Sequence, residues 1–355
     1  MSERRPQTDR TLKPSWLPTV RRQTRFRPKN QRSLLLFSAC FSASPPRYAH
    51  NVQQDHAATV HAQTNGNTKG VLGRIVDTLN QQGSEPLSSR SYSINGVARY
   101  LDGKHSQTIL SRSGVKRFVP YAAKFRDSID AMSKNVSGSI FAETFNGILD
   151  DALAKTESLG AILDGSAFSP NTAFSNSGLE KQLKQVANIM KARKTIGSER
   201  DVFFVNIGGF DTHSNMKTTL ETKFKEIDDA LGKFETEMID QKLWDSVALL
   251  SASDFGRTLV TNGAGTDHAW AGHNFMVGGA VKGSKILGSY PASLADDAPL
   301  SVRTGGRFIP TTSWEAVWHG IASWFGVEDG NMAKVLPGMG LFPKEDMLTR
   351  EAMFE

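Results

Sequence analysis

Two apolar segments that each end in a turn of small residues place the strongest constraint on how this chain can fold. Residues 202–207 and 246–252 are rich in aliphatic and aromatic side chains, and an amphipathic segment of helical periodicity separates them. The order strand, helix, strand predicts a parallel sheet, because parallel neighbours need a long crossover connection. In such sheets the turns that follow the strands carry the functional groups. We therefore expect a functional site where these two segments end.

Acids and histidines lie in these turns. Asp211 and His213 follow the first apolar segment and a Gly208-Gly209 pair, and Asp254 follows the second segment. Side chains two residues apart in extended chain point the same way, so Asp211 and His213 can reach one cation. The alternative is a capping aspartate with a hydrogen-bonded histidine. The repeat of the pattern after a second strand favours a metal site.

Further candidates follow closely in the chain. Arg257 has a planar fork of donors that suits either a tetrahedral oxyanion or a pair with Asp254. A glycine-rich loop next contributes Asp267, His268 and His273 as possible metal ligands. Oxygen and nitrogen donors without a thiolate suit zinc, manganese or iron, so the identity of the metal stays open.

Charge is unevenly distributed along the 355 residues. The formal net charge is +6, but residues 1–47 hold 11 Lys and Arg against 2 Asp and Glu, which leaves 31 basic against 34 acidic residues elsewhere. The body of the protein is therefore mildly acidic. This distribution argues against a basic nucleic-acid-binding face.

The basic segment resembles a targeting sequence. Arg- and Pro-rich residues precede the apolar run Leu34-Leu35-Leu36-Phe37 and the small residues 42–44, a pattern typical of a secretory signal or an organelle transit peptide. A disordered tail or a mispredicted exon is the alternative. We expect a leader at residues 1–47, removed on export or import. No apolar run approaches the roughly 18 residues that cross a bilayer.

A polar segment follows, with three histidines at positions 50, 56 and 61 among amide side chains. Their spacing suits no single helical face, so a surface segment is the simplest interpretation. The sharper hypothesis is a loop in which His50 and His56 bind substrate. Residues 97–196 show mostly helical periodicity at 115–133, 140–163 and 179–196, which predicts a helical cap or flanking layer.

The ordered set GFDTH, SDFGRT, GTDHA and GGAVKG, together with AHNVQQDH, KGVLGRI, FIPTTSWEAVWHGIASWFGV and GLFP, resembles the domain of unknown function family fifteen-oh-one. This family is placed in the alkaline phosphatase and sulfatase superfamily. The resemblance covers about residues 50–342. It implies an alkaline-phosphatase-like α/β fold, with a mostly parallel sheet flanked by helices in a single domain at residues 48–355.

The resemblance also implies roles for individual residues. Asp211 and His213 look like ligands of a first metal, Asp254 like the acid of an SDHG turn, and His268 like a later ligand. Phe255 stands where many relatives have a ligand histidine. Superfamily members begin with a strand that bears an Asp and a nucleophile, and nothing similar is recognisable before residue 49. We therefore expect the usual first strand to be missing.

Two functions of different class remain open. The first is metal-dependent hydrolysis of a phosphate or sulfate ester, in which Arg257 stabilises the equatorial charge. The second is metal or anion binding on the same fold without turnover. Expected partners are a small or polymeric ester substrate and no nucleic acid, and the sequence leaves the oligomeric state open.

Overall fold

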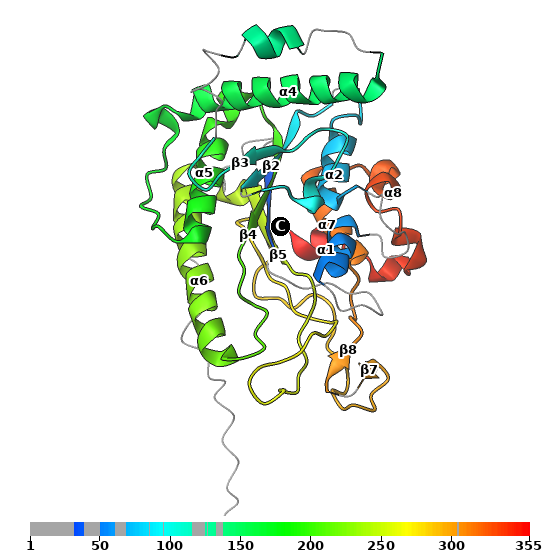
Figure 1. Ribbon diagram of the computed structural model, residues 1–355. Coiled ribbons are helices and arrows are strands. Elements are labelled where there is room, and N and C mark those ends of the chain that lie inside the picture. The colour runs from blue at the N-terminus through cyan, green and yellow to red at the C-terminus, as the bar shows by residue number, and fades with distance from the viewer. Residues whose placement is uncertain are drawn as a thin grey trace, which may run out of the picture.

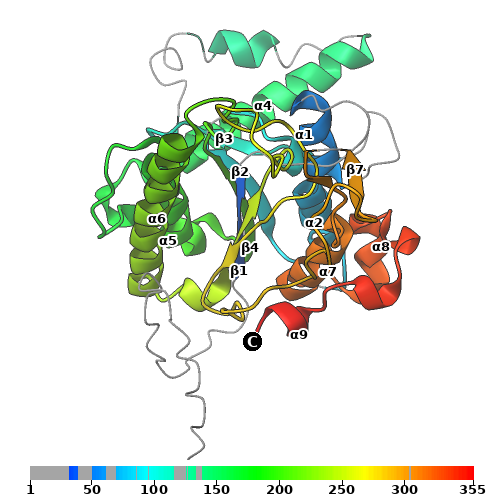
Figure 2. The same ribbon diagram turned by 90° about the horizontal axis from the view of Figure 1, so that it is seen from below.

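The computed structural model describes residues 32–38, 50–60, 69–84, 86–94, 96–115, 125, 127–132, 138–303 and 305–355. One sheet runs through the centre of the protein, and helices cover both of its faces (Figures 1 and 2). Among the described helices, none is both long and apolar enough to cross a membrane. This architecture confirms the expected α/β class.

The main sheet has the strand order β3-β2-β4-β1-β5-β6. The pairs among its first five strands are parallel, and β6 pairs with β5 in the antiparallel direction. The mostly parallel sheet expected from the sequence is therefore confirmed. The strands are β1 (Arg32–Ser38), β2 (Ser89–Ile94), β3 (Thr108–Leu110), β4 (Arg200–Asn206), β5 (Val247–Ala252) and β6 (Met276–Val277).

The expectation that the sheet lacks a central first strand was wrong, although the strand found there contains no Asp. Residues 32–38, assigned from the sequence to the leader, form β1 and lie between β4 and β5 in the sheet. The register pairs Arg32 with Arg200 and Ser33 with Val247. A central parallel strand is buried on both faces and therefore reads as a continuous apolar run, which is also the composition of a signal peptide. The sheet therefore includes residues of the segment that was expected to be a leader ending at residue 47.

One face of the sheet is covered by α1 (His50–Thr59), α2 (Val71–Leu79) and α7 (Trp314–Phe325), as Figure 2 shows. Their buried side chains form one core cluster with Val202, Ala248 and Leu250 of the strands. The short helices α8 (Met332–Val335) and α9 (Arg350–Met353) join this layer through contacts with α2 and α7. The start of β1 is tied to the same layer, since the Arg32 guanidinium lies 5.0 Å from the Trp324 ring centroid.

A buried arginine connects the helices of this layer. Arg74 of α2 donates from Nε to the carbonyl oxygen of Val335 at 2.6 Å and from Nη2 to that of Thr59 at 2.6 Å. Its Nη1 donates to the carbonyl of Lys69. Burial lowers the pKa of Arg74 to about 10. The three carbonyl groups compensate a charge that would otherwise be costly to bury.

The opposite face is covered by α5 (Gly178–Ile196) and α6 (Met216–Asp240) (Figure 2). Phe203 and Val205 of β4 belong to this second core cluster, whereas Val202 belongs to the first. This alternation is the period of two that a strand imposes.

At the start of β4, the side chain of Asp201 is buried and accepts a hydrogen bond from the Ser198 hydroxyl. Burial raises the pKa of Asp201 to about 7, although that hydrogen bond opposes the rise.

Helices of the region 97–196 agree with the periodicity where the structure describes them. The segments expected at 140–163 and 179–196 are α4 (Ile140–Leu163) and α5. Ser177 caps α5, since its hydroxyl accepts from the Glu180 amide at 3.2 Å. Most of the helix expected at 115–133 lies outside the described residues. In Figure 1, α4 crosses one end of the molecule while the β7–β8 hairpin lies at the other end.

The rest of the chain is mostly loops and short elements. A two-stranded sheet, β7 (Ser301–Arg303) with β8 (Arg307–Phe308), follows the long loop after β6. The short strand considered at residues 285–287 does not form, and Ile286 there is 82% exposed. The 3₁₀ turns are η1 (Arg99–Leu101), η2 (Ser166–Phe168), η3 (Trp244–Ser246), η4 (Asp329–Asn331), η5 (Met339–Leu341) and η6 (Lys344–Asp346).

Candidate metal centre

The side chains predicted from the two turns meet at one edge of the sheet. Asp211 lies five residues beyond the end of β4, and Asp254 lies two residues beyond the end of β5. His50 is the first residue of α1, the helix that follows β1. All three positions lie beyond the carboxyl ends of adjacent parallel strands, where open α/β sheets bind ligands.

A glycine allows the loop that carries His268 to approach the loop that carries Asp211. A Cβ atom added to Gly265 would lie 2.2 Å from the carbonyl oxygen of Thr212 and 2.5 Å from the carbonyl carbon of His213. The Thr266 amide donates to the Thr212 carbonyl at 3.1 Å. The glycine therefore brings the two loops into backbone contact, which a larger residue would prevent.

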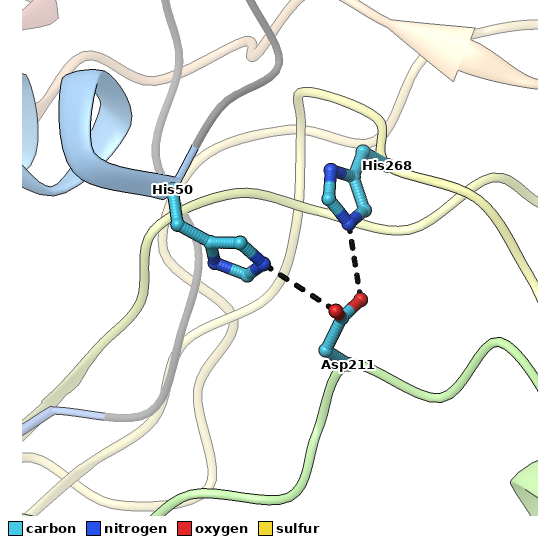
Figure 3. Close-up of side chains that lie close together, drawn as sticks. All are labelled: His50, Asp211 and His268. Carbon is cyan, nitrogen blue, oxygen red and sulfur yellow. Dashed lines mark hydrogen bonds and ion pairs between the residues drawn. The ribbon is translucent and has the colours of Figure 1, made fainter.

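Asp211 is at the centre of the cluster. Its Oδ1 lies 2.9 Å from His213 Nε2 and 3.0 Å from His268 Nε2, and it also accepts from Arg257 Nη1. Its Oδ2 lies 3.4 Å from His50 Nε2. Figure 3 shows the imidazoles of His50 and His268 approaching this carboxylate from two sides. Burial alone would raise the pKa of Asp211, but the hydrogen bonds from Arg257 and His268 outweigh it and hold this pKa below its ordinary value.

The spacing of the donor atoms fits a cation. The Nε2 atoms of His213 and His268 are 3.2 Å apart, and each lies about as far from the Asp211 carboxylate. Two ligands that each lie about 2.0–2.1 Å from a tetrahedral zinc are roughly 3.3 Å apart. His50, Asp211 and His268 also offer one ligand atom each within 4.8 Å of one another. The residues present therefore fit a divalent metal held by imidazole and carboxylate.

His50 is held from behind by a second carboxylate. Its Nδ1 lies 3.1 Å from Asp254 Oδ2, and the same oxygen accepts from Gln54 Nε2 at 2.8 Å. The Asp254 side chain is only 5% exposed, whereas that of Asp211 is 39% exposed. The two acids thus differ in environment, since Asp211 faces solvent and Asp254 lies beneath His50.

Phe255 supports two of the three imidazoles of the cluster, those of His50 and His268. Its ring centroid lies 4.6 Å from that of His50 and 4.1 Å from that of His268, and the residue is 1% exposed. The aromatic ring offers no donor to a metal, so the position that resembles a ligand histidine has a packing role here. It restricts the orientations that the two histidines can adopt.

Arg257 lies beside the cluster but pairs with Asp211 and not with Asp254. Thr266 fixes the guanidinium, because Nε donates to its hydroxyl at 3.1 Å and Nη2 donates to its carbonyl oxygen. Nη1 donates to Asp211. The side chain of Arg257 is 13% exposed, so the positive charge is positioned beside the candidate metal ligands rather than in solvent.

Three other candidates lie outside the cluster or at its margin. His56 is not in contact with it, and its buried Nδ1 makes no hydrogen bond among the described residues. His273 stacks on Tyr290 with ring centroids 5.2 Å apart. Asp267 Oδ1 is 3.8 Å from His213 Nδ1 and accepts from Asn262 at 3.0 Å, which places it at the margin.

Sequence reasoning did not single out Gln54 and Thr266, and it gave His50 a role in binding substrate. The amide and hydroxyl side chains carry no chemical signal of their own, because they act by fixing Asp254 and Arg257. One sequence signal could have identified Gln54 as a neighbour of His50. It lies four residues after His50, and residues four apart share a helix face.

Part of the chain matches a known protein family. Residues 143–304 match the family described as "Protein of unknown function (DUF1501)". The match includes the turns that carry Asp211, His213, Asp254 and His268, and it ends before the last helices of the chain. A search of curated proteins found no match to this chain. The similarity supports the family resemblance seen in the sequence and brings no activity with it.

Proposed function

We propose that the protein is a divalent-metal-dependent hydrolase of phosphate or sulfate esters, with an alkaline-phosphatase-like site. The observation that carries the proposal is the convergence of one carboxylate and three imidazoles, contributed by α1 and the loops after β4 and β5. These are donors that zinc, manganese and iron accept. When bound, the cation would polarise an ester oxygen and neutralise part of its charge.

The electrostatics of the chain's own residues support anion chemistry at this place. Asp211 carries the negative charge that attracts the cation, and Arg257 places a permanent positive charge within contact of the same carboxylate. An equatorial oxygen of a tetrahedral ester beside the cation would lie close to this guanidinium. Arg257 is suited to that role because its donors are oriented by Thr266 before a substrate arrives. The exposure of Asp211 and His213 leaves the cluster open to a ligand.

Metal binding without turnover is a second candidate, and one observation favours it. Three of the five N–H donors of Arg257 already have partners, one on Asp211 and two on Thr266. In this arrangement the guanidinium can hold the ligand Asp211 in place as well as bind substrate. The two functions share the cation site and differ in whether an ester is hydrolysed.

Metal content and turnover test the proposal together. The full chain, dialysed against chelator and reloaded with Zn²⁺, Mn²⁺ or Fe²⁺, should retain stoichiometric metal and hydrolyse an aryl phosphate or an aryl sulfate. Asp211→Asn should lose both properties, whereas Asp229→Asn, at an exposed acid on α6 paired with Lys225, should keep both. Metal retention without hydrolysis of either ester would favour the second candidate. Absence of metal binding by the unmodified chain would refute both.

A further inference from the structure

We propose that the site holds one cation per chain and that Asp254 positions His50 for this cation instead of binding it. This inference rests on the metal site proposed above. It differs from the role that the family resemblance implies for Asp254, which is that of a metal ligand. The contacts of Asp254, the orientation of His50 and the packing of Phe255 carry the argument.

The hydrogen bond from His50 to Asp254 fixes which imidazole nitrogen can bind a metal. Both ring nitrogens face a carboxylate, which can only accept: Nδ1 lies 3.1 Å from Asp254 Oδ2 and Nε2 lies 3.4 Å from Asp211 Oδ2. A cation shared by His50 and Asp211 would take the Nε2 lone pair, and the proton of the neutral ring would then lie on Nδ1, which has the shorter carboxylate contact. A carboxylate that holds the distal nitrogen of a metal-binding histidine is a common arrangement around metal ions.

The position of Asp254 places it behind the ring and not beside the cation. The ring of His50 stands between the two acids, with Nδ1 toward Asp254 and Nε2 toward Asp211. The Asp254 side chain is 5% exposed, and Gln54 donates to its Oδ2 at 2.8 Å. Oδ2 of Asp254 therefore has two donors from the same helix, α1. These bonds hold the carboxylate in place while it orients the histidine.

Phe255 removes the next ligand that a second cation would need. Its ring packs against His50 and His268, at centroid distances of 4.6 and 4.1 Å. The donors to Asp254 Oδ2 are an imidazole N–H and an amide N–H, and the next residue in the chain is Phe255. These groups disfavour a second cation at Asp254, because the phenyl ring has no lone pair and His50 and Gln54 present N–H groups to this carboxylate. The ligand atoms are concentrated around Asp211, at a single position.

A double-mutant cycle tests whether Asp254 acts through His50. Affinity for Zn²⁺ and Co²⁺ is measured by chelator competition for the full chain, Asp254→Asn, His50→Ala and the double variant. Asp254→Asn should weaken binding about 10- to 100-fold, as loss of an outer-shell partner does. The double variant should match His50→Ala within about twofold, since the aspartate then has no histidine to orient. A further loss of tenfold or more in the double variant would overturn the positioning role.

Two further measurements separate this inference from the function on which it rests. The visible absorption of the Co²⁺ form should keep its band positions in Asp254→Asn, because the ligand set is unchanged, and should shift in His50→Ala. The unmodified chain should bind one equivalent of metal, and two equivalents would refute the single-cation site. Failure of the unmodified chain to bind any metal would instead refute the proposed function.

A second variant covers the case in which Asp254→Asn does not fold, as judged by circular dichroism. Gln54→Leu removes a donor to Asp254 at an exposed position of α1 without altering either the acid or the histidine. It should weaken Zn²⁺ binding several-fold, and Asp229→Asn should not. Unchanged affinity in Gln54→Leu, if Asp254→Asn does not fold or also leaves the affinity unchanged, would overturn the proposal.

Discussion

Removal of β1 should prevent the protein from folding. The strand is paired along seven residues with β4 and along six residues with β5, so its loss deletes the backbone hydrogen bonds of both interfaces. About a dozen such bonds, at about 1 kcal/mol net each, amount to roughly 10 kcal/mol. The whole stability of a protein is typically about 5–15 kcal/mol. Deletion of residues 2–47 should therefore yield insoluble or unfolded protein.

Deletion of residues 2–31 is the matched control, because it removes most of the basic segment and keeps β1. Soluble yield, near-ultraviolet circular dichroism and the midpoint of thermal unfolding should resemble those of the full chain. A folded protein lacking residues 2–47, with an unchanged melting temperature, would refute the reasoning. The comparison also bears on the leader, since processing near residues 42–44 would remove the central strand. The mass of the mature protein should place any processing site before Arg32.

Three further predictions concern stability and the loop of the site. Arg74→Met should lower the free energy of unfolding by about 3–5 kcal/mol in urea titrations, because three carbonyl groups, two of them in buried hydrogen bonds, lose their donor. Burial raises the pKa of Asp201 to about 7, so the folded state favours the neutral acid, and the free energy of unfolding should fall as pH rises from about 4 to 7. Asp201→Asn should remove this fall, which is at most roughly 3 kcal/mol when urea unfolding at pH 5 is compared with pH 8. Gly256→Ala should destabilise the protein and impair metal binding, because the added Cβ would lie 1.8 Å from the carbonyl oxygen of Ala271.

Each of these predictions has an outcome that contradicts it. A loss below about 1 kcal/mol in Arg74→Met would show that water or another donor replaces the guanidinium. Stability of the unmodified chain that is equal at pH 5 and pH 8 would contradict the assignment to Asp201. Gly232→Ala is the control for Gly256→Ala, because a Cβ there meets nothing within 4 Å and should stabilise α6 by up to about 1 kcal/mol. Equal melting temperatures for the two alanine variants would argue against the steric explanation.

The sequence predicted the two turns of the site because the chemistry lies within a few residues of each strand. Asp211 and His213 follow β4, and Asp254 follows β5, so local patterns were sufficient to select them. The sequence did not show which imidazole nitrogen faces which carboxylate oxygen. The contacts of Asp211 and Asp254 with opposite nitrogens of His50 depend on the position of α1, which the local pattern does not determine.

The two histidines of α1 illustrate the same limit. His50 and His56 were grouped because both lie in one polar segment, and the structure brings only His50 to the cluster. Once the segment is a helix, six residues turn the chain by about 600°, which leaves the two side chains about 120° apart around the axis. The pattern of amides and histidines did not predict that helix. The different positions of His50 and His56 relative to the cluster follow from that helix.

The strand β1 could not be recognised from composition. A short apolar run after basic residues has the same composition in a signal peptide and in a buried parallel strand. What distinguishes them is pairing with partners far along the chain, at residues 200–206 and 247–252. Pairing at such separation leaves no local trace in the sequence.

The central position of β1 also sets a time order during synthesis. The first of its partners, β4, emerges from the ribosome roughly 170 residues after β1, and β5 emerges later still. At about 5–20 residues per second, the apolar strand waits roughly 10–30 s before any neighbour exists. During that interval the nascent chain exposes an unpaired apolar strand, which is the kind of segment that chaperones protect and that aggregates when they do not.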